Sequence, residues 1–273
     1  MLRKGDLTQG GITGTLLHFT LPMMVGSFLQ QCYNIADTLI VGQCIGAGAL
    51  AAVGSAYTLM VFLISVLLGL AMGSGTVFSL HYGAGNHVAL RRSIFSSFVL
   101  IGIVTLILNV AVFIWLDPIL RLLQVPQDIY GMMRSYSWII FCGIVFTFIY
   151  NFYASLLRAV GDSVTPLWFL AVSVVLNIAL DLFFILQLDW GIQGAATATV
   201  LAQGVAALGI IIYTYRRRPE LRWHHEDMCF DRTCLKEIAS FSTLTCVQQS
   251  VMNLGILMIQ GLVNSFGTAV MAA

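Results

Sequence analysis

The stretch PLWFLAVSVVLNIALDLFFILQL, residues 166–188, decides the fold class of this chain. Its only charged residue is Asp181, and its polar and apolar positions do not alternate as they would in a half-buried strand. A helix needs about 20 mostly apolar residues to cross the hydrocarbon core of a bilayer. We therefore predict that residues 166–188 form a transmembrane helix with a carboxyl group inside it.

The composition extends this prediction to the rest of the chain. Of its 273 residues, 59% are hydrophobic and 9% are charged, whereas soluble domains carry about 25% charged residues. A chain of this size cannot hide so much apolar surface from water, so an ordinary soluble globule is excluded. The formal net charge of +1 gives no basic excess that would indicate nucleic acid as a partner.

Seven stretches are long and apolar enough to span a bilayer. They are residues 16–41, 50–80, 94–116, 136–157, 166–188, 191–213 and 238–263. Their backbone groups must be satisfied within each segment, and the runs are too long and too continuously apolar for the strands of a membrane barrel. The predicted fold class is all-α, a polytopic helical membrane bundle, and the predicted location is the cell membrane, with the lipid bilayer as a partner.

The basic residues predict the orientation of the bundle. Eleven of the thirteen Lys and Arg fall in the amino terminus and in the second, fourth and sixth loops, whereas only Arg121 and Arg134 fall on the other side. Short loops rich in Lys and Arg stay in the cytoplasm. The amino terminus is therefore expected to be cytoplasmic.

The six cysteines do not form a framework that predicts disulfides or a metal site. Cys229 and Cys234 follow His224 and His225, but no second pair completes a closed shell of four ligands. We read this segment as a polar loop. We predict no metal site, apart from a Na⁺ site at the buried acids described next, and no cofactor.

Two of the twelve acidic residues, Asp37 and Asp181, lie inside predicted spans. A carboxylate in the middle of a bilayer costs about 2.5–3.5 kcal/mol on insertion scales, and no Lys or Arg lies inside a span to pair with either. Each must be protonated, hold a cation or face a polar cavity. We interpret both as functional; acids that are simply kept protonated for structural reasons are the alternative.

Neutral polar residues accompany Asp181. Asn177 lies one helical turn before it, on the same face, and Thr199 and Gln203 are one turn apart on the next span. Oxygen ligands gathered in this way suit a hard cation or a proton. The alternative is that Asn177 and Thr199 only form hydrogen bonds between helices.

Pro22 lies inside the first predicted span, fifteen residues before Asp37. Proline removes a backbone hydrogen bond and kinks a helix, so a change of charge at Asp37 could be converted into bending of this helix at Pro22. A static kink is the alternative.

Other conspicuous residues need only structural roles. We predict packing roles for Gly69 and Gly73 and interface or core roles for Tyr33 and Tyr57. The spans contain no Ser or Cys matched to a His and carboxylate set, and the chain has no zinc-peptidase motif or phosphate loop. We therefore predict that the protein is not an enzyme.

Four motifs in order along the chain resemble the MATE (multidrug and toxic compound extrusion) transporters of prokaryotic type. They are LPMM at 21–24 leading to YNIAD at 33–37, RAVGD at 158–162 with Pro166, NIALD at 177–181, and GIQGAATAT at 191–199. Members of this family have twelve helices in two lobes of six. The resemblance implies that residues 1–215 are the amino-terminal lobe, 216–236 an inter-lobe loop, and 237–273 the first helix of a truncated second lobe.

The resemblance also implies roles for individual residues. The cation-binding acid of the first helix falls on Asp37, the Asn and Asp of the fifth helix fall on Asn177 and Asp181, and the Thr of the sixth helix falls on Thr199. Supporting polar residues of the fourth helix fall on Tyr136 and Asn151. Pro22 matches the family proline at which the first helix bends, whereas Leu244 stands where the second lobe normally has a proline.

These observations predict a secondary active antiporter that exports amphiphilic or cationic organic compounds in exchange for H⁺ or Na⁺. The full-length protein is expected to be a monomer that takes small organic substrates. A lipid-linked oligosaccharide flippase of the same superfamily is the first alternative, against which the absence of Lys and Arg inside the spans argues. A seven-helix receptor and a membrane enzyme are alternatives from other classes.

Overall fold

The computed structural model describes residues 12–222 and 232–266, and these residues are helical apart from short connections. The helices are α1 Ile12–Cys44, α2 Ala47–Gly83, α3 His87–Leu122, α4 Gln127–Cys142, α5 Ile144–Ala159, α6 Val164–Leu182, α7 Gly191–Arg217 and α8 Arg232–Asn264. A π-helical turn, Phe183–Gln187, continues α6, and a 3₁₀ turn, Pro219–Leu221, follows α7. The predicted all-helical membrane fold is confirmed.

Each predicted span falls on a helix, but the described helices differ in how apolar they are. Five, namely α2, α3, α6 with its π-helical turn, α7 and α8, are long and apolar enough to cross a membrane, and the pair α4 and α5 makes a sixth if it counts as one span. The described part of α1 is not among them. It is 33 residues long but carries polar residues such as His18, Gln30 and Asn34 along its length.

Residues 136–157, predicted as one span, fall on two helices, because α4 and α5 meet at Gly143 with a bend of 47°. At this bend α7 lies close to α4 and α5. A Cβ atom at residue 143 would lie 2.5 Å from Cγ2 of Val200, so only glycine fits there without displacing α7.

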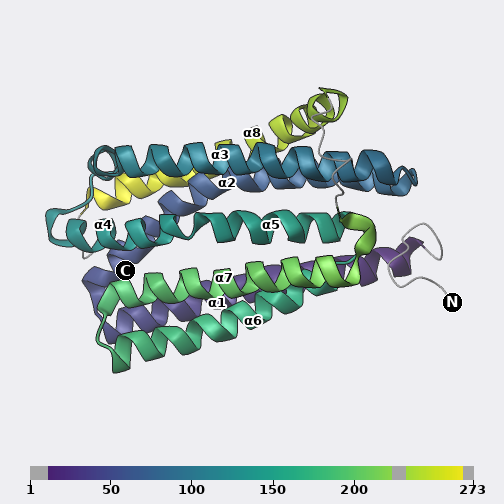
Figure 1. Cartoon of the computed structure of the whole chain (residues 1–273). Helices are drawn as coiled ribbons and strands as arrows, with labels where there is room; N and C mark the ends of the chain where they lie inside the picture. The colour runs from purple at the N-terminus through teal and green to yellow at the C-terminus, as the bar shows by residue number, and fades with distance from the viewer. Residues whose placement is uncertain (1–11, 223–231, 267–273) are drawn as a thin grey trace.

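The helices form a bundle with α4 and α5 in its centre (Figure 1). α2, α3 and α8 lie on one side of this pair, and α1, α6 and α7 lie on the other. The α2–α3 turn, the α5–α6 turn and the carboxyl end of α7 lie at the same end of the bundle, and these are segments that carry the predicted cytoplasmic bases. We refer to this end as the cytoplasmic end.

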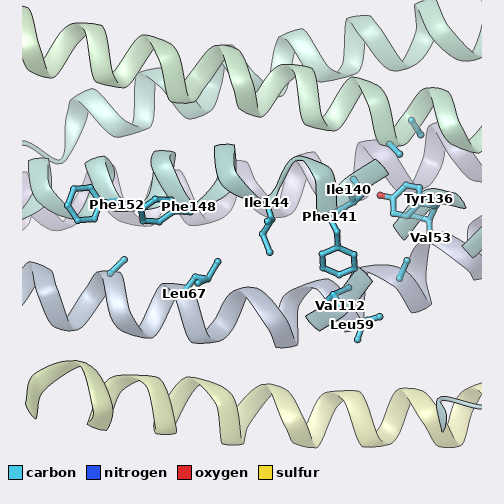
Figure 2. Packing of buried hydrophobic residues seen from close by; sticks show 14 of the residues in the cluster. Val53, Leu59, Leu67, Val112, Tyr136, Ile140, Phe141, Ile144, Phe148 and Phe152 are labelled. Carbon is cyan, nitrogen blue, oxygen red and sulfur yellow. The ribbon is translucent and has the colours of Figure 1, made fainter. Parts of the chain in front are cut away.

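The apolar core lies where α2 and α3 pack against α4 and α5 (Figure 2). Phe152 is fully buried and meets Phe78 and Phe98 edge to face, with ring centroids 6.0 and 5.2 Å apart. Such ring pairs stabilise the fold by more than the burial of their apolar area alone. This core holds α5 in place, and α5 in turn packs against α7.

The packing prediction for two glycines of α2 is confirmed. A Cβ atom at Gly69 would overlap the backbone of Cys246, and one at Gly73 would overlap the backbone of Ser242. Small residues let membrane helices approach closely, and here they bring α8 against α2. At the other end of this contact, Asn264 accepts a hydrogen bond from Ser55 at 3.0 Å.

The predicted division of the chain at residues 215 and 237 stays a prediction. The structure ends α7 at Arg217 and begins α8 at Arg232, five residues before the predicted second-lobe segment. The Cys229 and His224 segment lies outside the described residues. Within residues 12–222 and 232–266, no group of three or more His, Cys, Asp or Glu side chains is placed to hold a metal ion.

Candidate functional site

The two intramembrane acids come together between α1 and α6. Asp37 is 7% exposed and Asp181 is fully buried, although 144 residues separate them in the sequence. Asp37 lies seven residues before the end of α1, about 10 Å along the helix axis from the end that is opposite to the cytoplasmic one. The two acids therefore occupy the outer half of the bundle.

The carboxyl groups of Asp37 and Asp181 are close enough to interact directly. The Oδ1 atom of each is buried and has no hydrogen-bond partner among the described residues. Two like charges in such contact, shielded from water, repel each other strongly. Unless a proton or a cation lies between them, the pair is unstable in its doubly ionised form.

Neutral polar groups link Asp181 on α6 to Thr199 on α7 and then to Tyr33 on α1 through hydrogen bonds. In the amide orientation that satisfies both of its ends, Asn177 donates to Oδ2 of Asp181 at 3.0 Å and accepts from Oγ1 of Thr199 at 3.3 Å. The hydroxyl groups of Thr199 and Tyr33 are 3.3 Å apart and share a hydrogen bond. We call Tyr33, Asp37, Asn177, Asp181 and Thr199 the acid network.

Local structure after Asp181 is unusual. α6 ends at Leu182 and continues as the π-helical turn Phe183–Gln187. Such turns occur frequently at functional sites. The turn is held by Phe184, whose ring stacks on Trp190 with centroids 5.1 Å apart, and by the close approach of Gly194. These contacts fix the connection between the two helices that carry Asn177, Asp181 and Thr199.

A cavity of about 310 Å³ adjoins the acid network. Tyr33, Asn177 and Thr199 form part of its wall, and most of the rest is apolar or neutral. Its lining contains no charged residue among the described ones. The residues that line it are Gln30, Tyr33, Tyr57, Met60, Val61, Ile64, Leu68, Thr147, Tyr150, Asn151, Leu170, Ser173, Val174, Asn177, Thr199, Ala202, Gln203 and Ala206.

The two predicted supporting residues are placed differently. Tyr136 is buried and interacts electrostatically with Asp37 and Asp181, so it borders the acid network. Asn151 lines the cavity, but its amide donates to the backbone oxygen of Thr147 at 2.8 Å. The structure therefore brings Tyr136 to the acids and leaves Asn151 on the cavity wall.

Sequence reasoning missed Tyr33, which it assigned an interface or core role. The signal was available, because Tyr33 precedes Asp37 by four residues and so lies on the same helical face. It also missed the contact between Thr147 and Gln203, whose side chains are hydrogen-bonded to each other inside the cavity. These two residues lie on α5 and α7, and no local spacing relates them.

Pro22 lies within α1, which continues as one helix from Ile12 to Cys44. It lines a second cavity at the cytoplasmic end rather than the acid network. Leu244, the residue at the position where a second proline was expected, is 76% exposed on α8. The role of Pro22 as a bending point stays a prediction.

Comparison with known proteins places these features in context. A protein-family model described as MatE matches residues 22–183. The probable multidrug resistance protein YpnP of Bacillus subtilis (strain 168) is 32% identical over 278 residues, which cover 99% of this chain and 60% of YpnP. The multidrug export protein MepA of Staphylococcus saprophyticus is 31% identical over 74% of this chain and 45% of MepA.

The fold is also found among solved structures. The outward-facing conformation of a multidrug resistance MATE family transporter of the MOP superfamily superposes with a TM-score of 0.87. Its sequence identity is 24%, and the match covers 94% of this chain and 57% of that one. The present chain thus spans between 45% and 60% of the length of these relatives.

Proposed function

Because the chain belongs to the MATE family of multidrug transporters, we propose that the full-length protein is a secondary active antiporter that exports amphiphilic or cationic organic compounds in exchange for H⁺ or Na⁺. The observation that carries this proposal is the interaction between two buried carboxyl groups, Asp37 and Asp181, beside which no described residue places a base. Such a pair takes up one positive charge and releases it when its surroundings change.

The neutral members of the acid network support this assignment. Asn177 and Thr199 place an amide and a hydroxyl group beside the carboxyl groups, and both oxygens are ligands that Na⁺ accepts. The same groups can stabilise a shared proton through hydrogen bonds. The coupling ion in this proposal is therefore H⁺ or Na⁺ at Asp37, Asn177, Asp181 and Thr199.

The adjoining cavity supports the proposed substrate class. Its wall combines apolar side chains such as Met60 and Leu68 with the phenol rings of Tyr33 and Tyr57. Apolar walls accept many shapes, and aromatic rings attract organic cations through their faces. Thr199 belongs to both the cavity wall and the acid network, so occupation of one changes the surroundings of the other.

Replacing Asp37 by Asn tests the proposal. In liposomes containing the full-length protein, we expect Asp37→Asn to lower gradient-driven ethidium transport at least tenfold, because the site loses one of its two charges. Transport would be measured under imposed pH and Na⁺ gradients in turn. Asp189→Asn is the matched control, because Asp189 is an exposed acid that follows the π-helical turn. Its backbone has a left-handed conformation, with a φ angle of 52°, which Asn also adopts.

Unchanged ethidium transport with an unchanged dependence on pH and Na⁺ in Asp37→Asn would contradict the proposal. Equal losses in Asp37→Asn and Asp189→Asn would also contradict it, since the effect would not then be specific to the buried pair.

Removing the hydroxyl group of Thr199 has a smaller expected effect. Thr199→Val keeps the shape of the side chain but breaks its contacts with Tyr33 and Asn177. We expect the apparent affinity for the coupling ion to fall about fivefold, as for the loss of about 1 kcal/mol of hydrogen bonding. The measurement is the ion concentration at half-maximal transport.

Thr197→Val is the matched control for Thr199→Val, because the Thr197 hydroxyl only donates to the backbone oxygen of Gln193 on the same helix. An equal effect of the two substitutions would assign the loss to α7 as a whole instead of to the acid network.

A further inference from the structure

A second cavity, of about 340 Å³, lies at the cytoplasmic end of the bundle between α1, α5 and α6. Its walls include Pro22, Ser27, Gln31, Arg158, Ser163 and Pro166. It adjoins the cavity beside the acid network, with which it shares Gln30, Tyr150, Asn151 and Leu170. Its chemistry is different, because Arg158 places a fixed positive charge in its wall.

Arg158 has no ionic partner within the part of the chain that the structure describes. Its side chain is partly buried at the end of α5, and it forms no ion pair or side-chain hydrogen bond with any residue in the described ranges 12–222 and 232–266. No Asp or Glu is among the residues that line this cavity. Among the described residues, the guanidinium group therefore has no counter-charge, and the cavity has room for one.

The acid closest to Arg158 in the sequence, Asp162, has other partners. Its Oδ2 atom lies 3.6 Å from Nη2 of Arg218 and accepts a hydrogen bond from the Thr165 hydroxyl at 2.8 Å, while Oδ1 accepts from the Thr165 amide at 3.0 Å. Both carboxylate oxygens of Asp162 are thus engaged by Thr165 or Arg218. Asp162 holds this turn together and leaves Arg158 available to a ligand.

An uncompensated guanidinium group in a partly buried cavity favours an anion and repels the cationic compounds that the adjoining cavity is proposed to hold. The planar fork of Arg matches the oxygens of a phosphate group and can bind two of them at once. Ser27, Gln31 and Ser163 supply neutral polar groups on the same walls. The ligand class that fits is a phosphate ester.

The surroundings of the cavity indicate where the phosphate comes from. Large apolar side chains beside the cavity are exposed on both helices. On α6 these are Val164 and Trp168, and the side chain of Trp168 is 68% exposed. On α1 they are Leu21 and Met24, both more than 60% exposed. Tryptophan is enriched at the level of lipid headgroups, and basic pockets between helices on the cytoplasmic side bind anionic headgroups. Apolar side chains on both rims can contact acyl chains.

We propose that the cavity at Arg158 is a binding site for the phosphate headgroup of an anionic phospholipid of the cytoplasmic leaflet. The lipid lies against α1 on the side of Pro22, and its phosphate provides the counter-charge for Arg158. This site is separate from the acid network and does not depend on the proposed antiport.

Lipid retention in the full-length protein tests this proposal. The protein is transferred to phosphatidylcholine nanodiscs with a minor fraction of phosphatidylglycerol, and bound phosphatidylglycerol is measured by native mass spectrometry. We expect Arg158→Gln to lower its affinity about tenfold, as for the loss of a hydrogen-bonded charge. Arg217→Gln, which removes an exposed base from the same end of the bundle, should leave the affinity unchanged.

Arg158→Lys keeps the charge and should retain most of the binding, which separates loss of the ligand from loss of the fold. Equal losses in Arg158→Gln and Arg217→Gln would overturn the proposal in favour of general surface attraction. Absence of bound phosphatidylglycerol in the unmodified protein would overturn it outright. Binding of inorganic phosphate at Arg158 in pure phosphatidylcholine, with no preference for phosphatidylglycerol, would overturn the assignment to a lipid.

Discussion

Replacing Asp181 by Asn is expected to reduce ion-coupled export at least tenfold while leaving the folded protein as stable as before or more stable. Asp181 is fully buried, and its carboxyl group interacts with that of Asp37, with no base from the described ranges beside the two. Asn has nearly the same shape and removes the repulsion between the two acids, so the fold does not need the charge. Transport in liposomes and the thermal midpoint Tm would be measured on the same samples.

The double variant gives the sharper measurement. Because Asp37 and Asp181 interact directly, the effects of Asp37→Asn and Asp181→Asn on transport should not multiply, and the double variant should be no worse than the poorer single one. Effects that multiply would mean that the two acids act at independent sites. A marked fall in Tm in either single variant would favour a structural role for the acids.

Gly73→Ala is expected to lower Tm by about 2–10 °C. A Cβ atom at residue 73 would overlap the backbone of Ser242, and backbone cannot rotate out of the way as a side chain can. α8 would have to move away from α2. Fluorescence-detected size-exclusion chromatography after heating measures the shift.

Gly54→Ala is the matched control on the same helix. Nothing lies within 4 Å of a Cβ atom at Gly54, so the substitution adds only helix propensity and should keep or slightly raise Tm. If Gly73→Ala proved as stable as Gly54→Ala, the close contact between α2 and α8 would not hold in the folded protein.

The helical spans could be predicted closely because membrane insertion is decided locally. Residues 166–188 needed only their own length and apolarity to predict a span, and the structure has α6 and its π-helical turn there. The close approach at Gly143 could not be predicted from residues 136–157, because the side chain that packs there, Val200, lies on a different helix. Glycine inside an apolar run is too common to indicate a break without its neighbours.

The candidate site was predicted in part. Asp37 and Asp181 were recognisable because a charge in an apolar run is costly, and Asn177 was recognisable by its spacing from Asp181. Asn151, predicted as a supporting residue, lies on the wall of the adjoining cavity, and its supporting role stays a prediction. Whether these residues bind the coupling ion stays a prediction for the experiments above.

The sequence by itself determined that this chain is a helical membrane protein, which family it resembles and which two acids lie out of water. These properties follow from local apolarity and from motifs, which do not require knowledge of contacts. Only the tertiary structure decided that Asp37 and Asp181 interact, that Tyr33 joins Asp181 through Thr199 and Asn177, and that Arg158 lines a cavity in which no described residue supplies a counter-charge. The physical reason is that electrostatic pairing depends on distances between helices, and those distances are set by packing between segments that lie far apart in the sequence, such as α7 against Gly143.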